Sequence, residues 1–161
     1  MTAHTTAASR HRRWLPALAL AWAGTALAQY ADDDRTDWRE DPAPPPPAYT
    51  TEASQLISID MPSGTSVQVA IDPATLALNR TTGVARYVVV ARGVSAVNAS
   101  YEGIRCATSE YKVYARRTEG QPWAPVSAPQ WKPMFGQSGI VTSYPARLAR
   151  DGLCMGLTMR Q

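Results

Sequence analysis

The chain is short and, apart from its first segment, formally neutral. It has 161 residues, with 16 Lys and Arg, 13 Asp and Glu, and two His. His4 and His11 both precede residue 28, the expected end of a signal peptide, as do three of the arginines. The remaining 133 residues are enough for one domain and contain no imidazole. This composition excludes Ser-His-Asp and Cys-His catalysis, His-ligated metal sites and a strongly basic overall field for nucleic acid.

Residues 1–28 have the three-part layout of a secretory signal peptide. A basic segment at 10–13 precedes an apolar run at 14–23, and the small residues Ala26 and Ala28 mark the expected cleavage site. The apolar run is about half of the roughly 20 residues that a membrane-spanning helix needs. We therefore expect cleavage after Ala28 and a periplasmic or secreted product with no membrane span.

Residues 29–53 are acidic at first and then rich in proline. Five of the six positions from Pro42 to Pro47 are proline. Eight acids against two arginines give residues 29–60 a net charge of −6, which leaves +6 for the remainder. Such a stretch buries little apolar area and favours an extended chain. We predict a disordered linker that contacts the basic body through charge, with Trp38 as an aromatic side chain able to dock.

Apolar runs rich in β-branched residues, separated by turn residues, indicate a single β-rich domain over residues 54–161. The predicted fold is a β-dominated α+β fold, in which an antiparallel sheet of about five to six strands carries one short C-terminal helix at 144–152. The apolar run 84–91 indicates a central strand, and Asp72 with Pro73 indicates a turn. The expected strands are 56–61, 66–71, 75–78, 84–92, 96–106 and 109–115.

Cys106 and Cys154 are the two cysteines of the chain. Because an exported chain enters an oxidising compartment, we expect them to form one disulfide. The bridge would join the end of one strand to the segment after the helix. No free thiol would then remain for nucleophilic chemistry.

The block SYEGIRC at residues 100–106 is continued at spaced positions, namely Thr108, Glu110, Lys112, Tyr114, Ala115, Trp131 and Cys154. Together these positions resemble the cryptic neisserial protein 1-like family. The resemblance covers roughly residues 66–154 and omits the acidic and proline-rich stretch. It implies an exported bacterial protein of unknown function and supplies no catalytic residues.

Side-chain alternation along the SYEGIRC strand predicts two different faces. Tyr101 and Arg105 share one face, whereas Glu102 shares the other face with Cys106. If the Cys106 face is inward, Glu102 is a buried carboxylate, and a buried carboxylate must be paired or hydrogen-bonded.

For Glu102 we weigh two interpretations. The first is a structural ion pair with a cross-strand Arg86 or Lys112. The second is a perturbed general acid with Glu110 as the second carboxylate, as in a glycosidase. The candidate structural or binding residues are Tyr101, Glu102, Arg105, Glu110 and Lys112.

Three functions are compatible with this sequence. The first is a non-enzymatic binding or structural module acting on an unknown envelope component, and the second is a carboxylate-dependent hydrolase of the periplasm. The third is an interaction protein that uses the acidic tail as a tether. Because the mature chain has no imidazole and no expected free thiol, we favour the first. We predict no catalytic residue, no cofactor, no metal site and no nucleic-acid partner; the ligand, the oligomeric state and the associated membrane stay open.

Overall fold

An antiparallel meander forms the body of the protein, as the sequence predicts. The computed structural model describes residues 37–135 and 144–160. The first five strands pair in chain order, and the two short strands that follow both pair with the fifth. The strands of this sheet are β1 (Ile57–Ile59), β2 (Gln68–Asn79), β3 (Val84–Arg92), β4 (Val97–Arg105), β5 (Glu110–Thr118), β6 (Ala124–Pro125) and β7 (Lys132–Pro133).

Strand β2 joins two segments that the sequence predicts as separate strands. Asp72 and Pro73 do not form a chain reversal; instead, the pairing of β2 with β3 shifts register between Asp72 and Ala77. The Asp72 carboxylate accepts a hydrogen bond from the Ala74 amide at 2.9 Å, and the Thr75 hydroxyl donates to the Asp72 carbonyl at 2.6 Å. These local bonds absorb the extra residues within one continuous strand.

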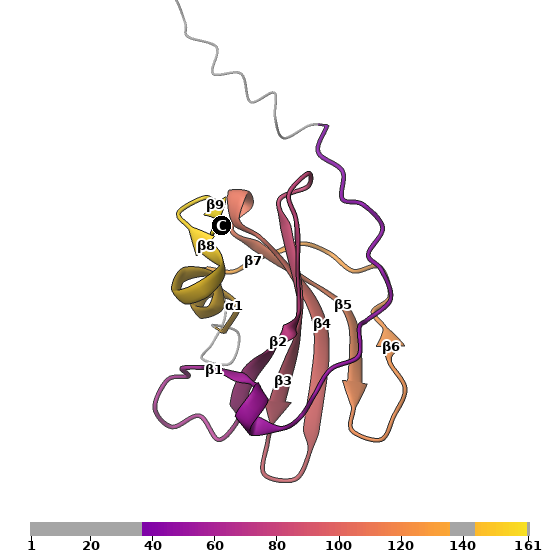
Figure 1. Ribbon diagram of the computed structural model, residues 1–161, viewed down its shortest axis with the longest axis vertical. Coiled ribbons are helices and arrows are strands. Elements are labelled where there is room, and N and C mark those ends of the chain that lie inside the picture. The colour runs from indigo at the N-terminus through magenta and orange to yellow at the C-terminus, as the bar shows by residue number, and fades with distance from the viewer. Residues whose placement is uncertain (1–36, 136–143, 161) are drawn as a thin grey trace, which may run out of the picture.

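The two faces of the sheet are covered by different parts of the chain. The face that we call inner packs against α1 (Tyr144–Leu148) and η4 (Ala149–Leu153), a turn of π-helix. The outer face carries a second buried cluster, formed by Val88, Ala99, Tyr101 and Ala115. Figure 1 shows α1 on one side of the sheet and the N-terminal segment on the other. Strand β3 is therefore buried on both faces over most of its length, as its apolar run predicts.

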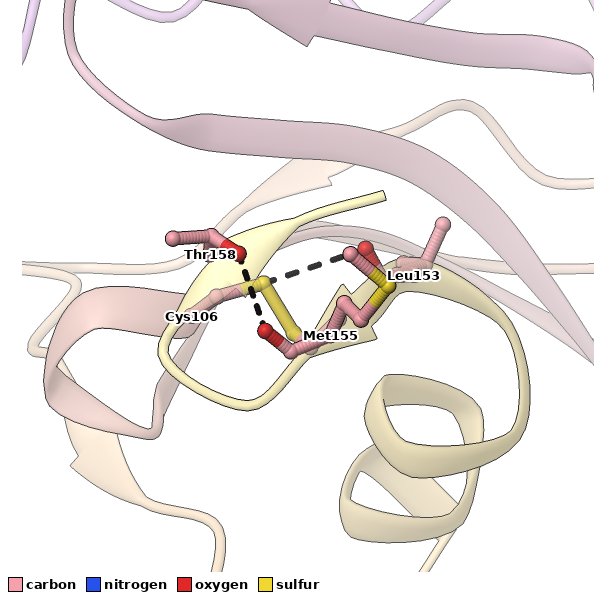
Figure 2. The surroundings of a disulfide bond; sticks show 5 residues. Cys106, Leu153, Met155 and Thr158 are labelled. Carbon is pink, nitrogen blue, oxygen red and sulfur yellow. Dashed lines mark hydrogen bonds between the residues drawn. A yellow bond between two sulfur atoms is a disulfide. The ribbon is translucent and has the colours of Figure 1, made fainter. Parts of the chain in front are cut away.

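The predicted disulfide is present and fastens the C-terminal segment to the sheet. Cys106 begins the short turn η2 (Cys106–Thr108) after β4, and Cys154 begins the hairpin of β8 (Cys154–Met155) and β9 (Thr158–Met159). The Cα atoms of the two cysteines are 5.7 Å apart. Figure 2 shows the bridge beside the hairpin, where the Thr158 hydroxyl donates to the Met155 carbonyl at 2.9 Å. Within the described ranges, no helix is long and apolar enough to cross a membrane.

Candidate functional site

Residues 37–52, which we call the strap, lie across the outer face of the sheet. The sequence predicts a disordered linker over 29–53, and residues 29–36 lie outside the described part of the chain. The rest of that stretch is extended but fastened, because side chains of the sheet bind it at two places. The η1 turn (Ala53–Gln55) then leads into β1.

The first anchor of the strap begins at Trp38. Its indole N–H donates to the Thr82 carbonyl at 2.9 Å. The Arg105 guanidinium lies 3.8 Å from the centroid of the indole ring, and Trp131 meets the same ring edge-on at 5.9 Å. A cation over an aromatic face is attracted by the ring quadrupole. Trp38 is thus docked, in accord with its interpretation as the aromatic exception in an acidic tail.

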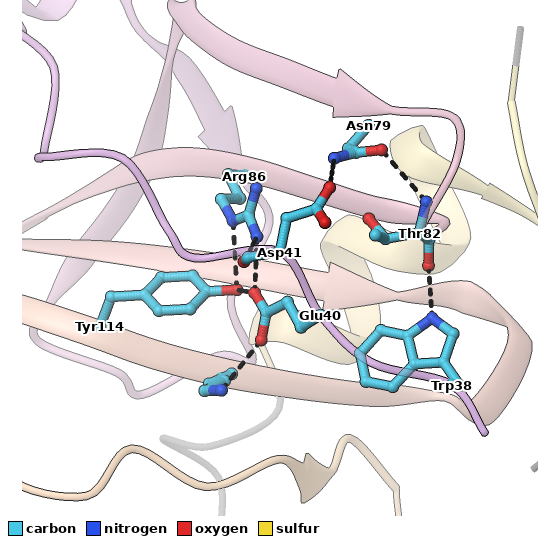
Figure 3. A network of polar contacts seen from close by, with 8 residues as sticks. Trp38, Glu40, Asp41, Asn79, Thr82, Arg86 and Tyr114 are labelled. Carbon is cyan, nitrogen blue, oxygen red and sulfur yellow. Dashed lines mark hydrogen bonds and ion pairs between the residues drawn. The ribbon is translucent and has the colours of Figure 1, made fainter. Parts of the chain in front are cut away.

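Glu40, two residues further on, is held by three donors from the sheet. Arg86 Nη2 donates to Glu40 Oε1 at 2.7 Å, and Lys112 Nζ donates to Oε2 at 2.9 Å. The Tyr114 hydroxyl also donates to Oε1. The Glu40 side chain is 10% exposed, and those of Arg86 and Lys112 are 7% and 16% exposed. Figure 3 shows the carboxylate pointing from the strap towards Arg86 and Tyr114.

The charge states at this site follow from its contacts. Burial alone would raise the pKa of Glu40, but hydrogen bonds from Tyr114, Lys112 and Arg86 outweigh it and lower that pKa below its usual value. Burial, and then the bond to Glu40, raises the pKa of Tyr114 far above its usual value. Glu40 is therefore ionised and Tyr114 is a neutral donor. Two cations and one hydroxyl surround one carboxylate.

Register explains why these donors converge. Arg86 on β3 lies opposite Gly103 on β4, and Gly103 lies opposite Lys112 on β5, so all three share the outer face. The register of β4 and β5 then shifts between Tyr101 and Glu102. Across this shift Glu102 pairs with Val113 and Tyr101 with Ala115, which leaves Tyr114 as the extra residue of a β-bulge. The bulge keeps the Tyr114 side chain on the outer face.

Gly103 provides the space for the Tyr114 ring. A Cβ atom added to Gly103 would lie 2.5 Å from the Tyr114 hydroxyl oxygen and 3.1 Å from the nearest ring carbon. The ring therefore lies directly over the glycine, with the hydroxyl next to Glu40 and Arg86. This close approach gives the glycine of the SYEGIRC block a physical role that the sequence alone did not reveal.

The second anchor fixes the other end of the strap. The Tyr49 ring meets Trp123 edge-on at 5.6 Å. The Thr50 amide donates to the Asp72 carboxylate at 2.8 Å, and Arg92 Nη2 donates to the Thr51 carbonyl at 2.7 Å. Between the two anchors the proline run is largely exposed.

The residues proposed from the sequence divide between the two faces. Tyr101, Arg105 and Lys112 meet at the strap: Tyr101 packs against the Tyr114 ring at 5.3 Å, Arg105 covers Trp38, and Lys112 binds Glu40. Glu110 pairs with Arg105 across β4 and β5, so it lies on the outer face as well. Glu102 alone among the five lies on the inner face, where it is 1% exposed.

The expected ion pair of Glu102 with Arg86 or Lys112 is wrong, because both cations lie on the outer face and bind Glu40. Glu102 accepts a hydrogen bond from the Tyr144 hydroxyl at 2.5 Å instead. Burial raises the pKa of Glu102 to about 7, although the Tyr144 bond opposes the shift. The proposed pairing with Glu110 as two catalytic carboxylates is also wrong, since the sheet separates them.

Sequence reasoning missed the strap residue Glu40 and the donor Tyr114. One signal was available for the first, since Arg86 interrupts an otherwise apolar run in a strand buried on both faces. A buried arginine needs a partner for its charge, and a carboxylate is the usual one. The acidic tail is where that carboxylate comes from.

The fold and site define a class: a small antiparallel β-sheet domain, closed by one disulfide, whose outer face is covered by its own N-terminal segment. The CNP1-like family matches residues 33–161, which is most of the chain. The protein therefore belongs to the CNP1-like family. The match extends beyond the expected 66–154 and includes the strap and the C-terminal hairpin. No match was found among curated proteins, and none among solved structures.

Proposed function

We propose that the protein is a non-enzymatic binding module of the bacterial envelope, and that it binds through the outer face of its sheet. One observation carries the proposal: Arg86, Lys112 and Tyr114 form a receptor that holds an ionised carboxylate in a largely buried place. Charge-assisted hydrogen bonds of this kind are short and selective for carboxylate geometry.

The surroundings of the receptor support a binding role. Arg105 and Arg117 lie over aromatic rings of the strap, at 3.8 Å from Trp38 and 5.6 Å from Tyr49. Aromatic and arginine side chains dominate the energetics of many binding surfaces. The outer face is thus equipped to hold an extended, acidic and aromatic chain.

The location in the envelope rests on two arguments. The Cys106–Cys154 disulfide is consistent with an oxidising compartment outside the cytoplasm. Residues 1–28 have the composition of a cleavable signal peptide. Export with cleavage after Ala28 belongs to the proposal, and the intact mass of the mature protein tests it.

A carboxylate-dependent hydrolase is the second candidate, favoured by the pKa of about 7 at Glu102. A general acid works best when its pKa lies near the operating pH. However, Glu102 is 1% exposed and its carboxyl group is bonded by Tyr144. A substrate would have to displace α1 to reach it, so binding is the better-supported function.

Sedimentation with cell envelopes tests the binding function. Purified mature protein is mixed with washed envelopes, and the retained fraction is measured for the wild type, for Glu40→Gln and for an Arg86→Gln, Lys112→Gln double variant. The exposed Lys132 on β7 offers a control, because Lys132→Gln also removes a positive charge but leaves Arg86, Lys112 and Tyr114 in place.

We expect the wild type and Lys132→Gln to be retained and the double variant to be lost to the supernatant. Glu40→Gln should be retained more than the wild type, because its strap no longer places a carboxylate in the receptor. Thermal unfolding of each variant shows that the sheet is intact. The proposed function is overturned if the double variant is retained as well as the wild type. It is also overturned if neither the wild type nor Glu40→Gln is retained.

A further inference from the structure

At its start the strap presents alternate side chains to the sheet. Trp38 and Glu40 are half-buried against the outer face, whereas their neighbours Asp37, Arg39 and Asp41 are exposed. In an extended chain, residues two apart point to the same side. The outer face therefore contacts the first and third residues of a Trp-x-Glu sequence and leaves the second in solvent.

We infer that the Arg86–Lys112–Tyr114 receptor binds an acidic peptide segment of an envelope protein, with an aromatic residue two positions before a carboxylate, and that the strap is a built-in competitor for this site. The inference deepens the proposed function and rests on it. Three observations lead to it: how the strap is attached, what its departure would leave behind, and where it can detach.

The first anchor of the strap is attached mainly through side chains of the strap. Residues 37–52 form no strand with the sheet, so no ladder of backbone hydrogen bonds has to break when they leave. Trp38 and Glu40 bind a carbonyl group and side chains of the sheet. Asp41 adds two contacts, because its carbonyl accepts from Arg86 at 3.0 Å and its carboxylate accepts from Asn79 at 2.9 Å. A peptide that offers the same two side chains and the backbone carbonyl that follows them can replace the contacts with Thr82 and with the receptor.

Departure of the strap would leave two cations without their carboxylate. The Arg86 residue is 6% exposed, and the carboxylate that it contacts comes from the strap and not from the sheet. A buried charge that loses its partner is strongly unfavourable. The open state therefore requires an anion, and the receptor selects a carboxylate because Arg86, Lys112 and Tyr114 surround one from different strands.

The proline run allows the first anchor to detach alone. Pro42 to Pro47 lie between the two anchors and are largely exposed, and proline has no amide donor with which to join a sheet. Trp38 and Glu40 can leave while Tyr49 and Thr50 stay bound. The detached end remains tethered near the site, and a tethered competitor acts at high effective concentration.

Competition of this kind predicts how affinity changes. When only a fraction of the protein is open, the apparent dissociation constant is the intrinsic value divided by that fraction. A strap that is open about 1% of the time weakens a peptide about 100-fold. Weakening the strap without altering the receptor must then tighten binding in trans.

A fluorescent peptide with the sequence of residues 37–50 is the probe, and its counterpart carries Gln in place of the glutamate that corresponds to Glu40. Polarisation measures binding of both peptides to the full mature chain as wild type, Glu40→Gln and Trp38→Ala, and to the Arg86→Gln, Lys112→Gln double variant. Glu52→Gln is the matched control, since Glu52 is an exposed strap residue.

We expect Glu40→Gln and Trp38→Ala to bind the acidic peptide at least about tenfold more tightly than the wild type, and Glu52→Gln to match the wild type. The Gln peptide should bind at least about tenfold more weakly than the acidic peptide. The double variant should bind the acidic peptide at least about tenfold more weakly than the wild type does. Folded Glu40→Gln and Trp38→Ala proteins that bind neither peptide, or both equally, would overturn the inference. So would a wild-type dimer in size-exclusion chromatography with light scattering that Glu40→Gln converts to monomer, because the strap of a second copy would then be the occupant.

Sedimentation with envelopes separates this inference from the proposed function. If the double variant loses its retention on envelopes but no variant binds the peptide, the outer face binds another chemistry and only the inference fails. If retention is absent as well, both fail.

Discussion

The two faces of the sheet each bury one glutamate, and they treat it in opposite ways. On the inner face Glu102 meets a neutral tyrosine hydroxyl, and its pKa rises to about 7. On the outer face Glu40 meets two cations and a hydroxyl, and its pKa is lowered. The inner carboxyl is covered by a segment that a disulfide ties down, whereas the outer one belongs to a strap held without covalent bonds. Burial by itself thus does not set the protonation state of a carboxyl group; the groups that contact the carboxyl do.

Removal of the disulfide should have the largest effect, and it acts on the inner face. The two cysteines are 48 residues apart, and closing a loop of that length stabilises a fold by about 4 kcal/mol in the loop-entropy treatment. We expect a Cys106→Ala, Cys154→Ala double variant to lose most of that free energy of unfolding in urea. Limited proteolysis should then cut first on the inner face, around α1. An unfolding free energy within about 1 kcal/mol of the wild type would show that packing alone holds that segment.

Glu102→Gln removes the titrating group of the inner face. The pKa of Glu102 is about 7 in the folded protein against a usual 4.5. Its favourable contribution to the free energy of unfolding is therefore complete below pH 4.5 and is lost as the pH rises through about 7. The Gln variant should escape this loss. Between acid pH and pH values above 7, the wild type should therefore lose on the order of 3 kcal/mol more of its unfolding free energy than the Gln variant loses.

Urea unfolding at about pH 5 and about pH 8.5 measures the difference. Glu110→Gln is the control, because Glu110 is a half-buried glutamate on the outer face of the neighbouring strand. Parallel pH profiles for Glu102→Gln and the wild type would contradict the assignment of a raised pKa to Glu102.

Glu40→Gln should show the opposite dependence on pH. The pKa of Glu40 is lowered in the folded protein. Its contribution to the free energy of unfolding is therefore present above pH 4.5 and is lost as the pH falls through the pKa of Glu40 in the folded protein. At pH 7 we expect Glu40→Gln to lower the free energy of unfolding by about 2 kcal/mol, which is the contribution of a hydrogen bond to a charged group. The cost should shrink in acid. Glu52→Gln should stay within about 0.5 kcal/mol of the wild type, and an equal cost for both variants would mean that the receptor does not recognise Glu40.

Gly103→Ala should have the smallest effect on stability, and it acts on the outer face only. The added methyl group would lie 2.5 Å from the Tyr114 hydroxyl oxygen, so the ring must shift away from Glu40. We expect this overpacking to lower the free energy of unfolding by about 1 to 2 kcal/mol. The pH dependence that Glu102 produces should be unchanged. Thermal unfolding against pH tests both statements, and a Gly103→Ala protein with an altered inner-face profile would contradict them.

The fold was largely predictable because its signals are local. Runs of β-branched residues and the turns between them mark the strands, and the two cysteines of a chain that is expected to be exported mark the bridge. The joining of two predicted strands into β2 was not predictable, because it depends on how Asp72 and Thr75 bond to the nearby backbone.

The site was predictable only in part. Alternation correctly put Arg105 and Tyr101 on one face and Glu102 on the other, but the partner of Glu102 depends on where Tyr144 docks, 42 residues away. Nothing local distinguishes Glu40 from the other acids of the tail. The position of Tyr114 depends on a bulge, and a bulge is a property of two strands in register.

The strap also has consequences for the order in which the protein assembles. Glu40 is made 72 residues before Lys112 and 74 before Tyr114, so it exists long before its receptor does. Contacts so distant along the chain form late, because the intervening chain must first be ordered. An early segment with hydrogen-bonding strand character would meanwhile risk pairing with the wrong edge. We therefore expect the prolines and acids of the strap to keep it unpaired until β5 is in place, so that the outer face closes late in folding.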